Sequence, residues 1–186
     1  MVSQRIARNL VDRSAEVVPG LFVLDDLACG AMCSVYGAAV VHACKEPCHR
    51  KALGYRGRNP IDGHPGYWAY QQGPQLYLNL IDADDVRYVS TKAIRAALDF
   101  LAYWEQFGNV VIHCNQGRSR APSIALMHLV QRGGYLPREY DGAVVEFRKL
   151  YPAYAPGRGI AEWMRRYWDV IVDVLVWRGG SVAPLG

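Results

Sequence analysis

The sequence predicts an α/β fold: a single domain whose small, parallel-rich twisted sheet is flanked by helices. Short β-branched and apolar runs alternate along the chain with helical patterns, and strands that are separated by helices pair in parallel. The chain has 186 residues and is 51% hydrophobic, which suffices for one sizeable core. We therefore expect residues 15–178 to form one domain, with an N-terminal arm over 1–14 and a flexible tail over 179–186.

Three apolar runs predict strands, over residues 37–43, 76–81 and 109–112. Between the first two, residues 45–74 contain nine Gly or Pro and little periodicity, which predicts a long loop. The loop carries the following basic and aromatic residues: Arg50, Lys51, Tyr55, Arg56, Arg58, Tyr67, Trp68 and Tyr70. These residues either line a substrate cleft or are ordinary surface side chains, and the sequence supports both interpretations equally.

Periodic apolar patterns predict four helices, over residues 90–106, 121–132, 138–150 and 159–176. The second of them follows closely on the strand at 109–112. A short loop over residues 113–120 therefore joins a buried strand to a core helix.

That loop, His113-Cys114-Asn115-Gln116-Gly117-Arg118-Ser119-Arg120, suits phosphate chemistry on sulfur. Backbone amides at a strand-to-helix turn, together with the positive end of the helix, can hold a phosphoryl group. The same field stabilises a thiolate, so we expect Cys114 to be a nucleophile at neutral pH. The planar guanidinium of Arg120 can bind two phosphoryl oxygens at once and gains strength as charge develops on them.

Two other interpretations fit the loop less well. One is a buried, inert cysteine at a strand end, which is common for a lone intracellular cysteine. The other is a nucleotide-binding Walker loop, which needs a Lys-Ser/Thr pair after its second glycine, and this loop has none.

A Cys-x5-Arg loop that is preceded by histidine and entered from a strand resembles the catalytic loop of the cysteine-dependent protein tyrosine phosphatase superfamily. The short dual-specificity phosphatase branch fits best. The resemblance is strong over residues 76–150 and is traceable over about 16–44 and 151–168. Residues 17–24 resemble the opening strand of that branch.

The resemblance implies hydrolysis of phosphate monoesters through a phosphocysteine intermediate, without a metal or another cofactor. Phosphotyrosine, and with it phosphoserine and phosphothreonine of proteins, is the implied substrate class. The implied phosphate-binding residues are Asn115, Gln116, Gly117, Arg118, Ser119 and Arg120. In the family, the histidine at the position of His113 helps to order the loop and to keep the cysteine as a thiolate.

A cysteine phosphatase needs a general acid to protonate the leaving oxygen. Asp82, Asp84 and Asp85 follow the strand predicted at 76–81, at the edge of the sheet where ligands of open α/β folds bind. In the family, the acid lies some thirty residues before the nucleophile, and this spacing favours Asp84 as the catalytic acid, with Asp82 and Asp85 as the alternatives. The remaining aspartates would be helix caps near Ser90 or solvated loop charges.

Two features of the loop leave alternatives open. Most members of the family carry Ser or Thr directly after the loop arginine, where the hydroxyl assists departure of the thiolate, but this chain has Ala121. Ala121 is the sequence support for a pseudophosphatase that binds phosphorylated partners without turnover. Arg118 adds a charge, and the run 117–120 is also similar to that of a phospholipid phosphatase, so a phosphoinositide or phospholipid substrate is the alternative.

Four further cysteines form two Cys-x3-Cys pairs, Cys29/Cys33 and Cys44/Cys48, and the second pair is flanked by His42 and His49. This spacing is compatible with zinc. Cys44 ends a predicted strand, however, and the other pair lies in an apolar segment, so we expect no metal. The resemblance offers another role, because some phosphatases of the superfamily keep a second cysteine, here Cys44, that forms a reversible disulfide with the nucleophile.

Composition limits the remaining classes of function. A net charge of +4 suits an anionic substrate but is too small to indicate nucleic acid binding. No apolar run is long enough for a membrane span, the N-terminus lacks the pattern of a signal peptide, and five cysteines suit a reducing compartment. These observations predict a cytoplasmic protein and leave its oligomeric state open.

Overall fold

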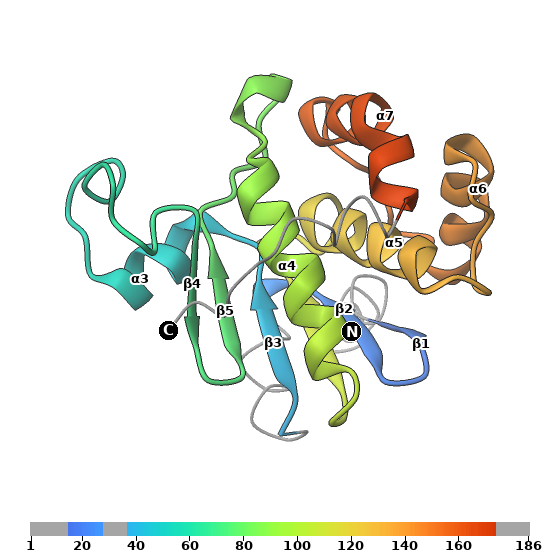
Figure 1. Cartoon of the computed structure of the whole chain (residues 1–186), viewed down its shortest axis with the longest axis horizontal. Helices are drawn as coiled ribbons and strands as arrows, with labels where there is room; N and C mark the ends of the chain where they lie inside the picture. Colours follow the sequence, from blue (N-terminus) through green and yellow to red (C-terminus); the bar gives the residue numbers. More distant parts are fainter. Residues whose placement is uncertain (1–14, 28–36, 174–186) are drawn as a thin grey trace, which may run out of the picture.

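The computed structural model describes residues 15–27 and 37–173. The expected N-terminal arm, the expected tail and the pair Cys29/Cys33 lie outside the described residues. Within them, a mixed sheet runs in the order β1-β2-β6-β3-β5-β4 (Figure 1). Its strands are β1 Ala15–Val18, β2 Leu21–Leu24, β3 Ala39–His42, β4 Ala69–Gln72, β5 Gln75–Leu78 and β6 Val110–His113.

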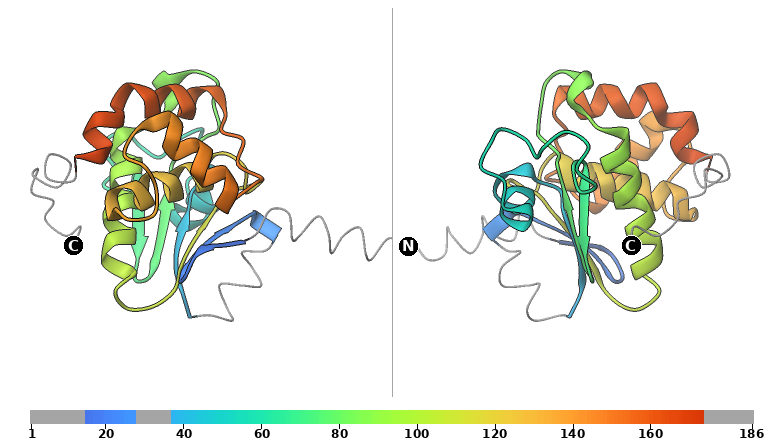
Figure 2. Two further views of the ribbon diagram at one scale, coloured as in Figure 1. Left: turned by 90° about the vertical axis from the view of Figure 1, so that its right-hand side faces the viewer. Right: turned by 60° about the vertical axis from the view of Figure 1, so that its left-hand side comes forward.

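The four central strands β2, β6, β3 and β5 are parallel, and the outer strands β1 and β4 pair antiparallel with their neighbours. The helices are α3 Arg50–Leu53, α4 Thr91–Trp104, α5 Arg120–Arg132, α6 Tyr140–Leu150 and α7 Arg158–Val172. Figure 2 shows α4 to α7 gathered on one side of the sheet and α3 on the other. The predicted α/β class with a parallel-rich sheet is thus confirmed.

The core lies between the sheet and α4, α5 and α7. Alternate strand residues such as Val41, Leu76 and Ile112 face it, because side chains of a strand point in turn to opposite faces. Residue Ile124 of α5 is fully buried against them. Among the described residues, no helix has both the length and the apolar composition that crossing a membrane requires.

Residues 17–24 form a hairpin rather than one strand. The chain reverses at Pro19-Gly20, where Gly20 has φ +82°, a conformation that glycine adopts without strain. The predicted strand at 76–81 ends at Leu78. The backbone N–H of Asn79 still donates to the Trp68 carbonyl, and its side-chain amide donates to the Tyr67 carbonyl.

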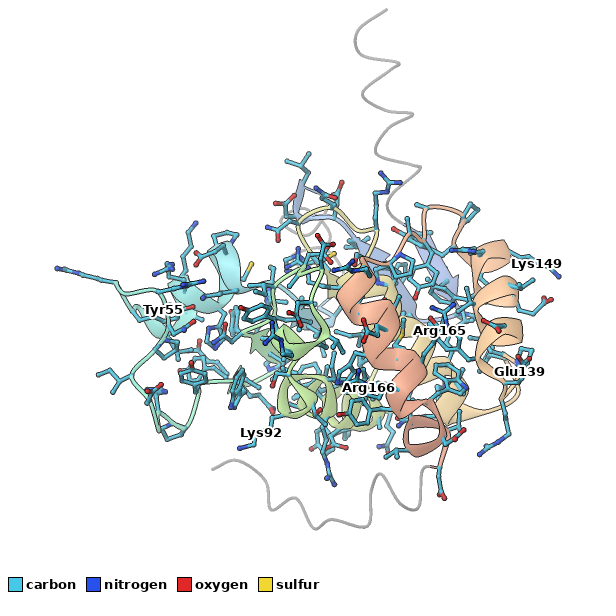
Figure 3. The ribbon with its side chains drawn as sticks, turned by 90° about the horizontal axis from the view of Figure 1, so that it is seen from above. Tyr55, Lys92, Glu139, Lys149, Arg165 and Arg166 are labelled. Atoms are coloured by element: carbon cyan, nitrogen blue, oxygen red, sulfur yellow. The ribbon has the colours of Figure 1, made fainter. Side chains whose placement is uncertain are left out.

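The expected long loop over 45–74 contains regular structure. A short helical turn, Lys45–His49, leads into α3, and β4 pairs with β5. The Arg50 side chain orders the segment by donating to the Glu46 carboxylate and to the carbonyls of Tyr55 and Gly57. This segment lies at the end of the molecule opposite α6, as the positions of Tyr55 and the α6 residue Lys149 show when the molecule is viewed from above (Figure 3).

The four predicted helices are present as α4 to α7, each within three residues of its expected start. The apolar pattern is strong in these segments because one face of each helix packs on the core. The predicted end of the last helix, residue 176, lies beyond the described range.

Candidate active site

The loop over residues 114–119 joins β6 to α5 at the carboxyl edge of the parallel strands. Cys114 is only 1% exposed and Arg120, the first residue of α5, only 6%. Gly117 has φ +64°, so the loop needs glycine at this turn. The structure therefore brings the two predicted key residues to one buried loop.

The Arg120 guanidinium is fixed by neighbouring oxygens. Its Nη1 donates to the Leu80 carbonyl at 3.1 Å and its Nη2 to Asn115 Oδ1 at 2.8 Å. The third nitrogen, Nε, is buried and has no hydrogen-bond partner among the described residues, since the Asp82 carboxylate lies 3.8 Å away. A buried, unpaired N–H on a cation is costly unless an anion comes to accept from it.

Two backbone carbonyls of the loop accept hydrogen bonds from the segment 151–155. Tyr151 Oη donates to the Gly117 carbonyl at 2.8 Å, and the Ala155 N–H donates to that of Arg118 at 2.9 Å. In a planar trans peptide the carbonyl and the next N–H point in opposite directions. The N–H groups of Arg118 and Ser119 therefore point away from the segment that carries Tyr151.

At the other end of the loop, the Asn115 side chain donates to the Glu46 carbonyl at 2.8 Å. Asn115 thus links the segment after β3 to Arg120. Gln116 and Arg118 are exposed, so their side chains lie at the rim of the loop.

The three candidate acids are in different surroundings. Asp82 contacts the loop, because Ser119 Oγ donates to Asp82 Oδ1 at 2.7 Å. The same Ser119 oxygen accepts from the Gly157 N–H at 2.9 Å. Asp82 is therefore placed to orient Ser119 and Arg120.

Asp85 is occupied by Arg87, whose backbone N–H and guanidinium donate to the Asp85 carboxylate. These hydrogen bonds lower the pKa of Asp85 to about 2. It stays ionised near neutral pH and cannot donate a proton there. Asp85 caps the short helix Val86–Tyr88, whereas the helix expected near Ser90, α4, is capped by the Ser90 side chain and by none of the three aspartates.

Asp84 is exposed, and its carboxylate has no hydrogen bond to any other described residue. Its backbone is fixed, however, because Arg158 Nε donates to the Asp84 carbonyl at 3.2 Å. A carboxylate on a fixed backbone, with no competing donor, is free to meet a substrate.

The start of α7 packs closely against this acidic segment. A Cβ at Gly157 would lie 2.7 Å from Asp82 Oδ1, and one at Gly159 would collide with the Ala83 carbonyl. Only glycine allows this approach. No sequence motif marks Tyr151 as part of the site, whereas the Gly-Arg-Gly run of residues 157–159 before a helix is a visible signal for the two glycines.

No family model matches the chain, and no curated protein matches it. Solved structures do match. DUSP15 is 15% identical, over 90% of this chain and 94% of that chain, with a TM-score of 0.57. Human DUSP28 is 17% identical, over 86% and 95%, with a TM-score of 0.55. PTPMT1, solved in complex with PI(5)P, is 14% identical, over 86% and 97%, with a TM-score of 0.57.

The chain has the dual-specificity phosphatase fold. This result confirms the resemblance at the level of architecture, and it places the loop 114–119 in a fold that is known among phosphatases. The identities are low, so the roles of individual residues rest on the geometry described above.

Behind the loop over residues 114–119, the His113 ring contacts side chains of β3 and of the segment that follows it. His113 Nε2 lies 2.6 Å from His42 Nδ1 and 4.0 Å from Cys48 Sγ. His49, which the sequence placed beside these groups, is directed elsewhere: its ring nitrogens contact the Gly66 carbonyl and the Tyr55 hydroxyl.

Cys44 is buried and its thiol hydrogen-bonds to Cys48. This hydrogen bond and burial raise the pKa of Cys44, whereas the same bond and those from His113 and His42 lower the pKa of Cys48. Cys44 also interacts electrostatically with Cys114.

Proposed function

We propose that this protein hydrolyses phosphate monoesters through a phosphocysteine intermediate. The observation that carries the proposal is the buried Arg120, whose Nε–H has no hydrogen-bond partner among the described residues and which lies in one loop with the buried Cys114. Nε and a terminal N–H of a guanidinium form the planar fork that binds two oxygens of a phosphoryl group.

In the proposed reaction, Cys114 attacks phosphorus and the ester P–O bond breaks as the S–P bond forms. Asp84 gives its proton to the leaving oxygen. It then takes a proton from water, which attacks the phosphocysteine and releases inorganic phosphate and the thiolate. Arg120 and the amides of residues 115–120 bind the phosphoryl oxygens in both steps.

The proposed substrates are phosphotyrosine and, with it, phosphoserine and phosphothreonine of proteins. A phosphoinositide or phospholipid is the second candidate, because the structure of PTPMT1 with PI(5)P is among the matches and because Arg118 places an exposed charge at the rim of the loop. A binding protein without turnover is the remaining alternative.

Turnover of para-nitrophenyl phosphate in excess EDTA tests the proposal. We expect metal-independent hydrolysis, followed by a preference for phosphotyrosine peptides over phosphoinositide vesicles. A preference for the vesicles would support the lipid alternative. Absence of turnover, with phosphate still bound, would support the binding protein.

The residue after Arg120 yields a kinetic prediction. Ala121 is buried in the first turn of α5 and supplies no hydroxyl to the sulfur that leaves in the second step. A neutral hydrogen bond contributes roughly 0.5–1.5 kcal/mol, or about two- to tenfold in rate. We therefore expect burst kinetics with a fast aryl phosphate, and a higher kcat for Ala121→Ser, measured by rapid mixing. A folded variant with unchanged kcat, together with no burst, would show that the first step is limiting.

Cys44 yields a redox prediction. If Cys44 forms a disulfide with Cys114, hydrogen peroxide should inactivate the wild type reversibly, with recovery on adding thiol. Cys44→Ser should lose activity irreversibly at a lower dose. Cys48→Ser is the matched control, because it replaces the cysteine that neighbours Cys44 and leaves Cys44 in place. This variant should recover like the wild type. Equal recovery of wild type and Cys44→Ser, measured in EDTA, would remove this role.

A further inference from the structure

We propose that His42, Cys48 and His113 form a binding site for a zinc ion behind the catalytic loop. Their ligand atoms all lie within 4.8 Å of one another. Cys48 Sγ is 4.0 Å from His113 Nε2, and His113 Nε2 is 2.6 Å from His42 Nδ1. The three side chains therefore converge on one point.

The sheet creates this convergence. His42 and His113 are register partners at the ends of the parallel strands β3 and β6. Their neighbours Val41 and Ile112 face the core below α5, so the two rings leave the opposite face of the sheet. Cys48 reaches the same place from the helical turn Lys45–His49 that follows β3.

The ring of His42 is already oriented as a ligand. Gln75 Oε1 lies 2.7 Å from His42 Nε2 and accepts its hydrogen, which leaves the Nδ1 lone pair directed at the cluster. Tyr77 stacks on the ring at 4.3 Å with an interplanar angle of 10°. A metal-binding histidine usually has such a partner on its other nitrogen.

The thiol of Cys44 completes the surroundings by hydrogen-bonding to Cys48. A hydrogen bond from a neighbouring donor stabilises a ligating thiolate. Cys44 thus supports the ligand in this proposal, and it is not counted among the ligands.

The donor set selects zinc. Two imidazoles and a thiolate suit this borderline-soft ion, whereas Ca²⁺ and Mg²⁺ require oxygen ligands. Zinc bonds of about 2.0–2.3 Å in a tetrahedron separate the ligand atoms by roughly 3.3–3.7 Å. The 2.6 Å contact between the two rings must therefore open by about 1 Å or less, and water fills the fourth position.

Proton balance is simple. The metal replaces the proton that the two rings share, so the hydrogen on His113 Nε2 moves to Nδ1. That nitrogen is buried and has no hydrogen-bond partner in the described part of the chain, so the free energy of metal binding must offset the cost of leaving its N–H unpaired. The Cys48 thiol proton is released to solvent.

The experiment uses the full chain, treated with chelator and kept reduced without added thiols. Titration with Co²⁺, a probe for zinc sites, should produce a thiolate-to-cobalt charge-transfer band that saturates at one ion per chain. Added Zn²⁺ should abolish the band and raise the melting temperature. Absence of the band from fully reduced wild type would overturn the proposal.

Variants locate the ion. Cys48→Ser should lose the band, and His42→Gln should weaken it at least tenfold, while melting of each metal-free variant checks its fold. Cys114→Ser should keep the band, as should the double variant Cys29→Ser/Cys33→Ser. A band that survives Cys48→Ser, or one lost with Cys114→Ser or with the double variant, would place the metal elsewhere and overturn the proposal.

Discussion

Replacing Cys114 with serine should reduce turnover of an aryl phosphate by roughly 10³-fold or more. The thiolate is the attacking group, and a serine hydroxyl is not ionised at neutral pH. Binding of inorganic phosphate should remain largely intact, because Arg120 and the loop amides are unchanged. Steady-state kinetics and calorimetric titration with phosphate measure the two effects.

Arg120→Lys is the companion variant. Lysine keeps the positive charge but loses the planar fork, so we expect nearly complete loss of activity together with weaker phosphate binding. It also loses the contacts to Leu80 and Asn115 that fix the guanidinium. Retention of more than a few per cent of activity by Cys114→Ser would contradict the mechanism, whatever the result for Arg120→Lys.

The strand–loop–helix arrangement around Cys114 and Arg120 could be predicted because its determinants are local. A β-branched strand, a glycine-containing turn and an apolar helix follow one another within 109–132, and Cys114 and Arg120 are fixed by this short path. The helices α4 to α7 are long enough for their apolar periodicity to be visible. Strand β4 and helix α3, each four residues long, are too short to produce such a pattern.

The supporting contacts could not be predicted, because they join segments far apart in the sequence. Asp82 meets Ser119 across 37 residues, and Ser119 meets Gly157 across 38. The pairing of His42 with His113 depends on β3 lying beside β6, an order that no local pattern determines. The sequence shows only that His42 and His49 flank the pair Cys44/Cys48.

Asp84, the proposed general acid, is the second residue whose loss should have a large effect. Asp84→Asn should lower kcat/KM for alkyl phosphates by about 10²–10⁴-fold, and less for aryl phosphates, whose leaving groups need less protonation. An acid that must be protonated loses its function as pH rises through its pKa. The basic limb of the kcat/KM profile should therefore flatten in Asp84→Asn.

Asp82 and Asp85 are the matched controls, because their contacts in the structure differ from those of Asp84. Asp85→Asn should leave the basic limb unchanged, because hydrogen bonds from Arg87 lower the pKa of Asp85 to about 2 and it carries no proton near neutral pH. Asp82→Asn should lower activity equally for alkyl and aryl phosphates, because Asp82 acts on Ser119 and Arg120 rather than on the leaving group. If Asp82→Asn instead flattens the basic limb and discriminates between leaving groups, while Asp84→Asn does neither, Asp82 is the acid. Its contact with Ser119 would then be the resting position of a catalytic carboxyl.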